Sequence, residues 1–162
     1  MYDTIVTLSL FIAALGAGLM AGVYFAFSGF IMRSFDELPG ARAADAMNAI
    51  NEVILRSWFM PLFFASTLLY AALAVVALID SGLAGRWLIL AAGLIYVIGM
   101  FLCTAARNVP LNNRLAATAG DARAAAETWA HYRQHWTRWN HLRSVCSLAA
   151  MGLSVYYLVR FA

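Results

Sequence analysis

Four long stretches without a charged residue dominate this sequence of 162 residues. Residues 4–32, 57–79 and 87–106 provide 29, 23 and 20 uncharged residues, and about 20 residues of helix cross a bilayer core. The fourth stretch, 144–159, has only 16, or roughly 24 Å of helix, so we place its span near 142–161. The chain is therefore predicted to be an all-α integral membrane protein with four spans.

The connections predict an up-down-up-down four-helix bundle that forms a single domain over residues 1–162. The connection at 80–82 is short, so neighbouring spans run antiparallel and both termini lie on one side. Amphipathic helices are predicted in the two long connections, near 42–56 and 121–141. Nine of the 11 arginines lie in or beside these connections: Arg33, Arg42, Arg56, Arg107, Arg114, Arg123, Arg133, Arg138 and Arg143. The positive-inside rule then predicts a multi-pass protein of the cell inner (plasma) membrane with both termini outside the cytoplasm.

The arginines, the small residues and the cysteines indicate what the chain can contact. The net charge of +3 comes from arginines interleaved with apolar spans, which predicts contact with membrane lipid and excludes a nucleic-acid footprint. Small residues recur every four positions from Ala14 to Ala26, a stripe that permits close helix packing within the chain or in a homo-oligomer. Cys103 and Cys146 each lie in an apolar stretch and are predicted to be free thiols.

The short fourth span singles out Arg143. Arg160 lies two residues from the chain end and can extend to water, which leaves Arg143 as the charge held against protein near the membrane boundary. The segment DARAAAETWAHYRQHWTRWNHLRS before it has strong helix formers and no breaker, so it is predicted to continue as helix into the span. One helical face carries aromatic rings, an amide and the guanidinium: Trp129, Tyr132, Trp136, Asn140 and Arg143, with Trp139 at its margin. That combination suits a flat, partly anionic aromatic ligand, although an interfacial aromatic belt accounts for the rings equally well.

Polar residues also follow the third span, in the motif RNVPLNN. Pro110 is expected to end the helix there, with Asn108, Asn112 and Asn113 capping the freed carbonyls. The functional alternative is a set of amide donors at the mouth of a pocket.

The histidines suggest two further chemistries. His131 and His135 are four residues apart, which can place two imidazoles on one metal, although a solvated helix face is the simpler interpretation. His141 stands at the membrane entry and is suited to move a proton near neutral pH, with a headgroup-contacting histidine as the alternative. A metal site formed by Cys103, Cys146 and His141 is a more remote option.

Four segments together resemble a four-helix membrane family of largely unknown function that includes the anthrone oxygenases. They are GLMAGVYFAFSGFIM in the first span, AMNAINEVI before the second, NVPLNN after the third and WAHYRQHWTRWNHLRS leading into the fourth. The resemblance implies a monooxygenase that oxidises an anthrone, a tricyclic phenolic ketone, to an anthraquinone with O₂ and no organic cofactor.

On this resemblance each site residue receives a role. His141 would be the base that removes the methylene proton. The groups that stabilise the oxyanion would be Arg143, Asn140, Asn108 and Asn112. The aromatic residues stacking on the small aromatic substrate would be Trp129, Tyr132, Trp136 and Trp139, with Asn51 and Tyr24 lining the pocket.

Two other classes of function stay open at this point. One is a metal- or haem-dependent membrane oxidoreductase that uses His131, His135, His141 or the two cysteines. The other is a non-enzymatic protein that binds a lipid or a quinone through the same aromatic and arginine groups.

Overall fold

The computed structural model describes residues 2–161, and all regular structure in that range is helical. Four helices are long and apolar enough to cross a membrane: Thr4–Phe35, Phe59–Ile79, Arg86–Ala116 and Ala122–Phe161. The predicted all-α class with four spans is therefore confirmed, and the protein is embedded in a membrane.

Two of the four spans contain π-helical turns. The first consists of α1 (Tyr2–Ala26), the π-helical segment η1 (Phe27–Ile31) and α2 (Met32–Phe35). The third consists of α5 (Arg86–Leu94), η2 (Ile95–Leu102), η3 (Thr104–Asn108) and α6 (Val109–Ala116). The amphipathic helix α3 (Gly40–Leu55), the second span α4 (Phe59–Ile79) and the 40-residue α7 (Ala122–Phe161) complete the chain.

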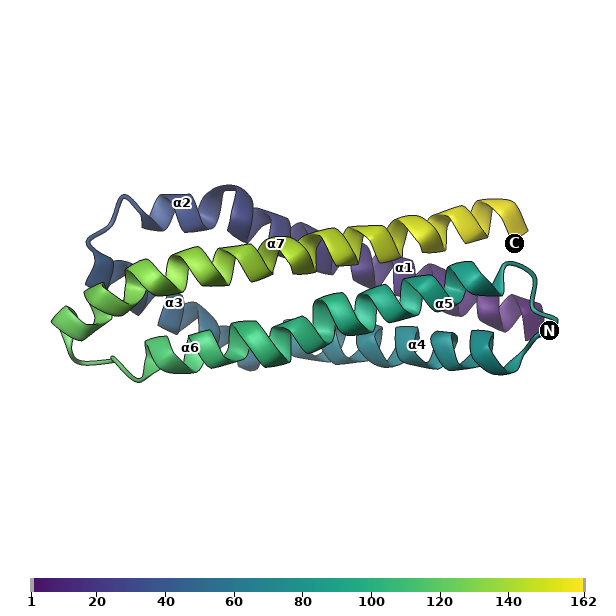
Figure 1. The fold of residues 1–162 in the computed structure, drawn as a ribbon, viewed down its shortest axis with the longest axis horizontal. Coiled ribbons are helices and arrows are strands. Elements are labelled where there is room, and N and C mark those ends of the chain that lie inside the picture. Colours follow the sequence, from purple (N-terminus) through teal and green to yellow (C-terminus); the bar gives the residue numbers. More distant parts are fainter. Residues whose placement is uncertain (1, 162) are drawn as a thin grey trace.

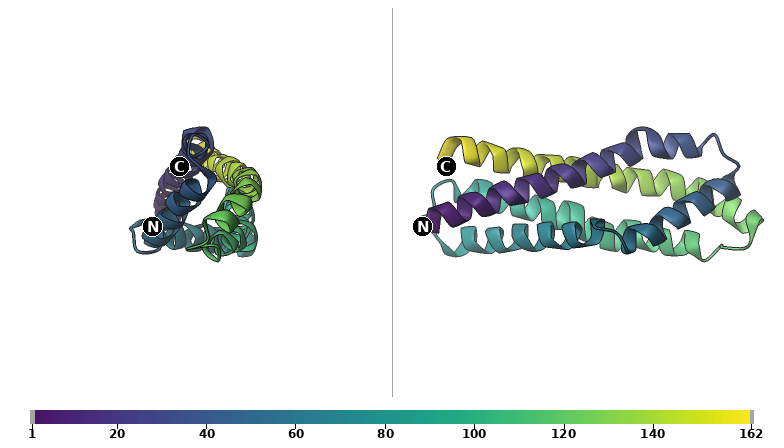
Figure 2. Two further views of the ribbon diagram at one scale, coloured as in Figure 1. Left: turned by 90° about the vertical axis from the view of Figure 1, so that its left-hand side faces the viewer. Right: turned by 180° about the vertical axis from the view of Figure 1, so that it is seen from behind.

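The spans run up, down, up and down along one long axis (Figure 1). The two ends of the described chain lie at one end of the bundle, next to the short α4–α5 turn, while α3 and the α6–α7 connection lie at the other end. Viewed along this axis, the helices surround a common centre (Figure 2). α7 contacts α1, α3, α5 and all three π-helical segments, so it is the element on which the bundle is assembled.

The core has two parts along this axis. One packs the membrane spans around residues such as Leu10, Met20, Tyr70 and Tyr96. The other packs α3 against α2, α6 and α7, through Met32, Ala43, Ala44, Met47, Leu115, Ala125, Trp129, Tyr132 and Trp136. Outside the first part, large apolar side chains such as Leu8, Phe11 and Leu15 are exposed, as expected of a surface that faces lipid.

The predicted helix end at Pro110 is wrong. The third span continues through it to Ala116, because Pro110 lies in the first turn of α6, where no intrahelical N–H donor is required. The π-helical turns of η3 immediately before it shift the hydrogen-bond register. Asn108 makes no cap, and its Nδ2 donates instead to the Trp136 carbonyl oxygen at 3.2 Å, which joins this span to α7.

The small-residue stripe of α1 packs only in part. Ala14 is buried, and a side chain added at Gly18 would meet Met151 of α7. Gly22 is exposed with no atom near its would-be Cβ. Within the monomer, the first half of the stripe thus packs inside the bundle, with Gly18 against α7, and the second half does not.

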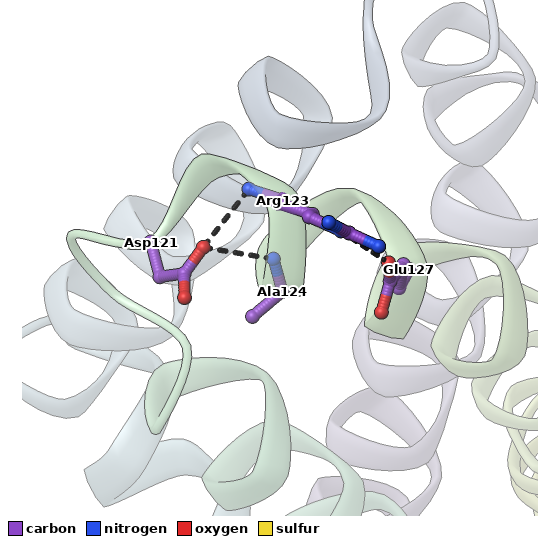
Figure 3. Close-up of polar contacts among 4 residues, drawn as sticks. All are labelled: Asp121, Arg123, Ala124 and Glu127. Atoms are coloured by element: carbon purple, nitrogen blue, oxygen red, sulfur yellow. Dashed lines mark hydrogen bonds and ion pairs between the residues drawn. The ribbon is translucent and has the colours of Figure 1, made fainter.

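The start of α7 is defined by a side-chain cap (Figure 3). Asp121 Oδ1 accepts hydrogen bonds from the backbone N–H groups of Arg123 and Ala124, both at 3.0 Å. One turn on, Arg123 Nε and Glu127 Oε1 form an exposed ion pair at 3.1 Å. The cap uses two backbone donors that the first turn of a helix leaves free.

Asp121→Ala should lower the free energy of unfolding by about 1 kcal/mol, because it removes both accepted hydrogen bonds at the helix start. Thermal unfolding in detergent, followed by circular dichroism, measures this as a lower midpoint. Glu127→Ala is the matched control and should change the midpoint less, because an exposed pair contributes little. Equal effects of the two variants would contradict the capping role.

Candidate functional site

A cavity of about 450 Å³ lies where α3 and the start of α4 meet the two π-containing spans and α7. Aromatic rings from all four spans line it, among them Tyr24, Phe63, Phe101 and Trp136. Its polar lining consists of Tyr24, Asn48, Asn51, Glu52, Thr104, Asn112, Asn113 and Arg143. A mostly apolar cavity with a few convergent polar groups is the usual form of a small-molecule site.

Arg143 is the buried charge at this cavity, since its residue is only 5% exposed whereas Glu52 is an exposed residue of the lining. Nη2 donates to Asn140 Oδ1 at 2.7 Å, and Nη1 donates to Thr104 Oγ1 at 3.3 Å. The guanidinium also lies over two rings, with Cζ 4.3 Å from the Tyr24 centroid and 5.1 Å from that of Trp136. No carboxylate within residues 2–161 forms an ion pair with it. The guanidinium therefore keeps a full positive charge that only amide, hydroxyl and ring dipoles offset.

Asn140 links this arginine to the first span. Its Oδ1 accepts from Arg143, while its Nδ2 donates to the Tyr24 carbonyl oxygen at 2.6 Å and to Ser28 Oγ at 2.5 Å. Both acceptors lie beside the π-helical turn η1, where the regular helical hydrogen-bond pattern changes. One buried amide thus satisfies a backbone carbonyl and orients the cation.

Several polar atoms at the cavity have no hydrogen-bond partner. Three are donors: Asn51 Nδ2, Trp136 Nε1 and Arg143 Nε. One is an acceptor, Asn48 Oδ1. All four are buried side-chain atoms of lining residues. Since buried polar groups are normally paired, the three donors at this cavity remain free to bind a ligand that accepts hydrogen bonds, such as a carbonyl or an oxyanion.

The residues predicted from the sequence fall into three groups. The cavity lining includes Arg143, Asn112, Trp136, Asn51 and Tyr24. A layer behind the lining contains Asn140, Asn108, Tyr132 and Trp129. In that layer Tyr132 donates its hydroxyl to Asn112 Oδ1 at 2.9 Å and stacks on the Trp129 ring.

Trp139 and His141 lie away from the cavity. Trp139 is half-buried under the Arg107 guanidinium, at 4.9 Å from its ring centroid. His141 is exposed and lines a separate polar cavity on another face of α7. The predicted face of α7, from Trp129 to Arg143, is thus buried as a whole. His141 is not part of it and does not lie with Arg143.

Three further lining residues, Asn48, Glu52 and Thr104, were not predicted from the sequence. Asn48, Asn51 and Glu52 recur at helical spacing on α3, which would have placed all three on one face. Thr104 lies one turn before Arg107, in a stretch that was interpreted only as membrane span. Its hydroxyl also donates to the Met100 carbonyl oxygen at 2.7 Å, which holds Oγ1 in place for Arg143.

The residues considered as alternative metal ligands do not form a group of three within residues 2–161. His131 and His135 stack with ring centroids 3.9 Å apart on the surface of α7. Within the part of the chain that the structure describes, no group of three or more His, Cys, Asp or Glu residues could hold a metal ion. Cys103 and Cys146 are free thiols.

Comparison with known families gave one match. The sequence model of a family described as anthrone oxygenase matches residues 53–153, more than half of the chain. Comparisons with curated proteins and with solved structures gave no significant match.

Asn140→Leu should lower the free energy of unfolding by about 3 kcal/mol, because the Tyr24 carbonyl and one guanidinium nitrogen of Arg143 lose buried partners. The measurement is the thermal unfolding midpoint in detergent. Ser144→Ala, which removes one 3.4 Å hydrogen bond to the Ala21 carbonyl, is the control and should have a much smaller effect.

Adding Arg143→Met to Asn140→Leu should recover part of that loss, since the unpaired buried charge is then gone. Strictly additive effects of the two substitutions would show that the amide and the guanidinium are not coupled.

Proposed function

The chain belongs to the anthrone oxygenase family, and we propose that it oxidises a flat phenolic or polycyclic aromatic ketone with O₂ in the cavity around Arg143. The observation that supports this most directly is the buried guanidinium without a carboxylate partner, at the wall of an aromatic cavity. An ionisable residue in a membrane span is a functional-site candidate by default.

The cavity suits a planar, weakly acidic substrate. Its volume of about 450 Å³ is within the range of small-molecule sites, and Phe59, Phe63 and Phe101 offer ring surfaces for stacking. A substrate ketone near Arg143 would accept hydrogen bonds from the donors that have no protein partner, Arg143 Nε, Trp136 Nε1 and Asn51 Nδ2. These contacts strengthen as the ketone becomes an enolate, because negative charge then gathers on its oxygen.

The reaction we propose begins when a base removes one proton from the substrate methylene. The resulting enolate reduces O₂, and a carbon–oxygen bond forms at the former methylene carbon. The peroxide anion takes the proton back from the base to give a hydroperoxide. Loss of the second proton from that carbon with cleavage of the O–O bond then yields the new carbonyl and water. One anthrone and one O₂ thus give one anthraquinone and one water, and the four electrons that reduce O₂ come from the substrate.

For the base we propose Glu52 in place of His141. Glu52 is the only carboxylate or imidazole among the residues that line the cavity. It lies on α3 next to Asn51 and is exposed, so a proton taken from the substrate can pass to water. His141 faces the other cavity.

Arg143→Met should lower kcat/KM for an anthrone about a hundredfold or more, because the positive charge that stabilises the enolate is removed. Oxygen consumption and anthraquinone absorbance in detergent measure the rate. Arg107→Met, which removes an exposed arginine outside the cavity lining, is the matched control and should keep activity near that of the parent. An Arg143→Met variant that folds and turns over like the parent would overturn the scheme.

Glu52→Gln should lower kcat about a hundredfold, since general-base catalysis typically contributes at least that factor. Asp45→Asn changes an exposed carboxylate on the same helix outside the cavity lining and is its control. Loss of turnover with His141→Gln, together with normal turnover of Glu52→Gln, would restore His141 as the base.

Measurements on the purified parent protein in detergent distinguish the proposed oxygenase from a metal-dependent oxidoreductase and from a non-enzymatic binding protein. We expect it to be colourless, to lack stoichiometric copper, iron or haem by metal analysis and visible spectroscopy, and to turn over in a chelator. A stoichiometric metal or haem whose removal abolishes turnover would favour the metal-dependent oxidoreductase. Tight binding of an anthraquinone without any oxygen consumption would favour the binding protein.

A further inference from the structure

A second cavity, of about 540 Å³, lies between the end of the first span and the middle of α7. It is lined by polar and charged side chains that the proposed oxidation does not use. Three of them are arginines, Arg33, Arg133 and Arg138, and one is a carboxylate, Asp36.

The charges at this cavity are not balanced. Arg133 Nη1 and Asp36 Oδ2 form an ion pair at 2.6 Å, which neutralises both. Arg33 and Arg138 are exposed and form no ion pair within residues 2–161. Two guanidinium groups therefore remain for an anion, and the fork of N–H donors on arginine matches the oxygens of a phosphate.

A hydroxyl also remains unpaired there. Thr137 Oγ1 is buried at the cavity and has no hydrogen-bond partner. Elsewhere in the bundle Thr67 and Thr104 donate to the carbonyl four residues earlier, both at 2.7 Å, which is the usual solution for a threonine inside a helix. Thr137 forgoes that bond, so its hydroxyl is left for a ligand of the cavity that Arg33 and Arg138 also line.

The position along the membrane axis indicates where such an anion comes from. The lining residues come from 28–36 and 133–141, around the predicted end of the first span near 32 and the predicted start of the fourth near 142, so the cavity lies at the level where the hydrocarbon core ends. On the membrane side of the cavity, Phe30 of the first span is 60% exposed and Val145 of α7 is 63% exposed. Acyl chains can lie against these apolar side chains while a phosphate occupies the cavity.

We propose that this cavity binds the phosphate of an anionic membrane phospholipid, through Arg33, Arg138 and Thr137. The anionic headgroup is favoured over a zwitterionic one because choline would bring a cation toward two unpaired arginines. This proposal is independent of the chemistry in the cavity around Arg143.

Native mass spectrometry of the full chain in detergent, with equal amounts of dioleoylphosphatidylglycerol and dioleoylphosphatidylcholine, tests it. We expect retention of one phosphatidylglycerol in preference to phosphatidylcholine. The Arg33→Gln/Arg138→Gln variant should lose about tenfold or more in apparent affinity for phosphatidylglycerol. Arg42→Gln/Arg114→Gln removes the same charge from exposed positions outside the cavity lining and should retain the lipid.

Thr137→Val keeps the shape of the side chain and removes only the hydroxyl, so it reports on the site even if the double variant fails to fold; it should weaken binding severalfold. Equal retention of the two lipids would overturn the proposal, as would equal losses in both arginine pairs or an unchanged affinity of Thr137→Val. Complete displacement of phosphatidylglycerol by inorganic phosphate would also overturn it, because the site would then serve a soluble anion.

Discussion

A guanidinium buried in a membrane bundle without a carboxylate is the constraint around which this protein is organised. Burying such a charge is costly unless polar groups replace its water. The replacements come from three spans: the Tyr24 ring from the first, Thr104 from the third, and Asn140 with the Trp136 ring from α7. Satisfying one cation therefore ties these spans together at one level and leaves part of the guanidinium facing the cavity.

Two of the three π-helical segments described above, η1 and η3, are found at this same level. η1 follows Tyr24 and includes Ser28, the two residues that accept from Asn140, while η3 begins at Thr104 and ends at Asn108, which donates to the Trp136 carbonyl. A π-helical turn offsets the side chains that follow it from the positions they would hold in an unbroken α-helix. Because of these offsets, the first and third spans direct polar groups toward the buried face of α7. Both spans then continue as helices after the π-helical turns.

Much of this arrangement could be predicted from the sequence, and the failures have identifiable causes. The lengths of the uncharged stretches predict the spans, and the helical period of α7 predicts one shared face for Trp129, Tyr132, Trp136, Asn140 and Arg143. The structure adds that this face is buried. The error at Pro110 arose because composition carries no signal for a π-helical turn. His141 was assigned to the same site because it stands at the membrane entry, next to Asn140 in the sequence, but adjacent residues on a helix point in different directions. Glu52 was overlooked because only the tertiary packing of α3 brings it to the cavity.

Two faces of α7 border the two cavities, and the arginines at these cavities suit different ligands. Arg143 lines the first cavity, and Arg138, together with Arg33 of the first span, lines the second. A buried guanidinium stripped of water favours charge that develops on a bound ketone, because few other dipoles compete for it. Exposed guanidiniums at the hydrocarbon boundary attract an anion that is already charged and partly hydrated, which is the state of a lipid phosphate. If both proposals hold, the arginines at this end of the bundle serve two binding sites as well as membrane topology. The orientation given by the positive-inside rule stays a prediction, and under it the lipid-binding cavity would face the cytoplasmic leaflet, where anionic lipids are concentrated.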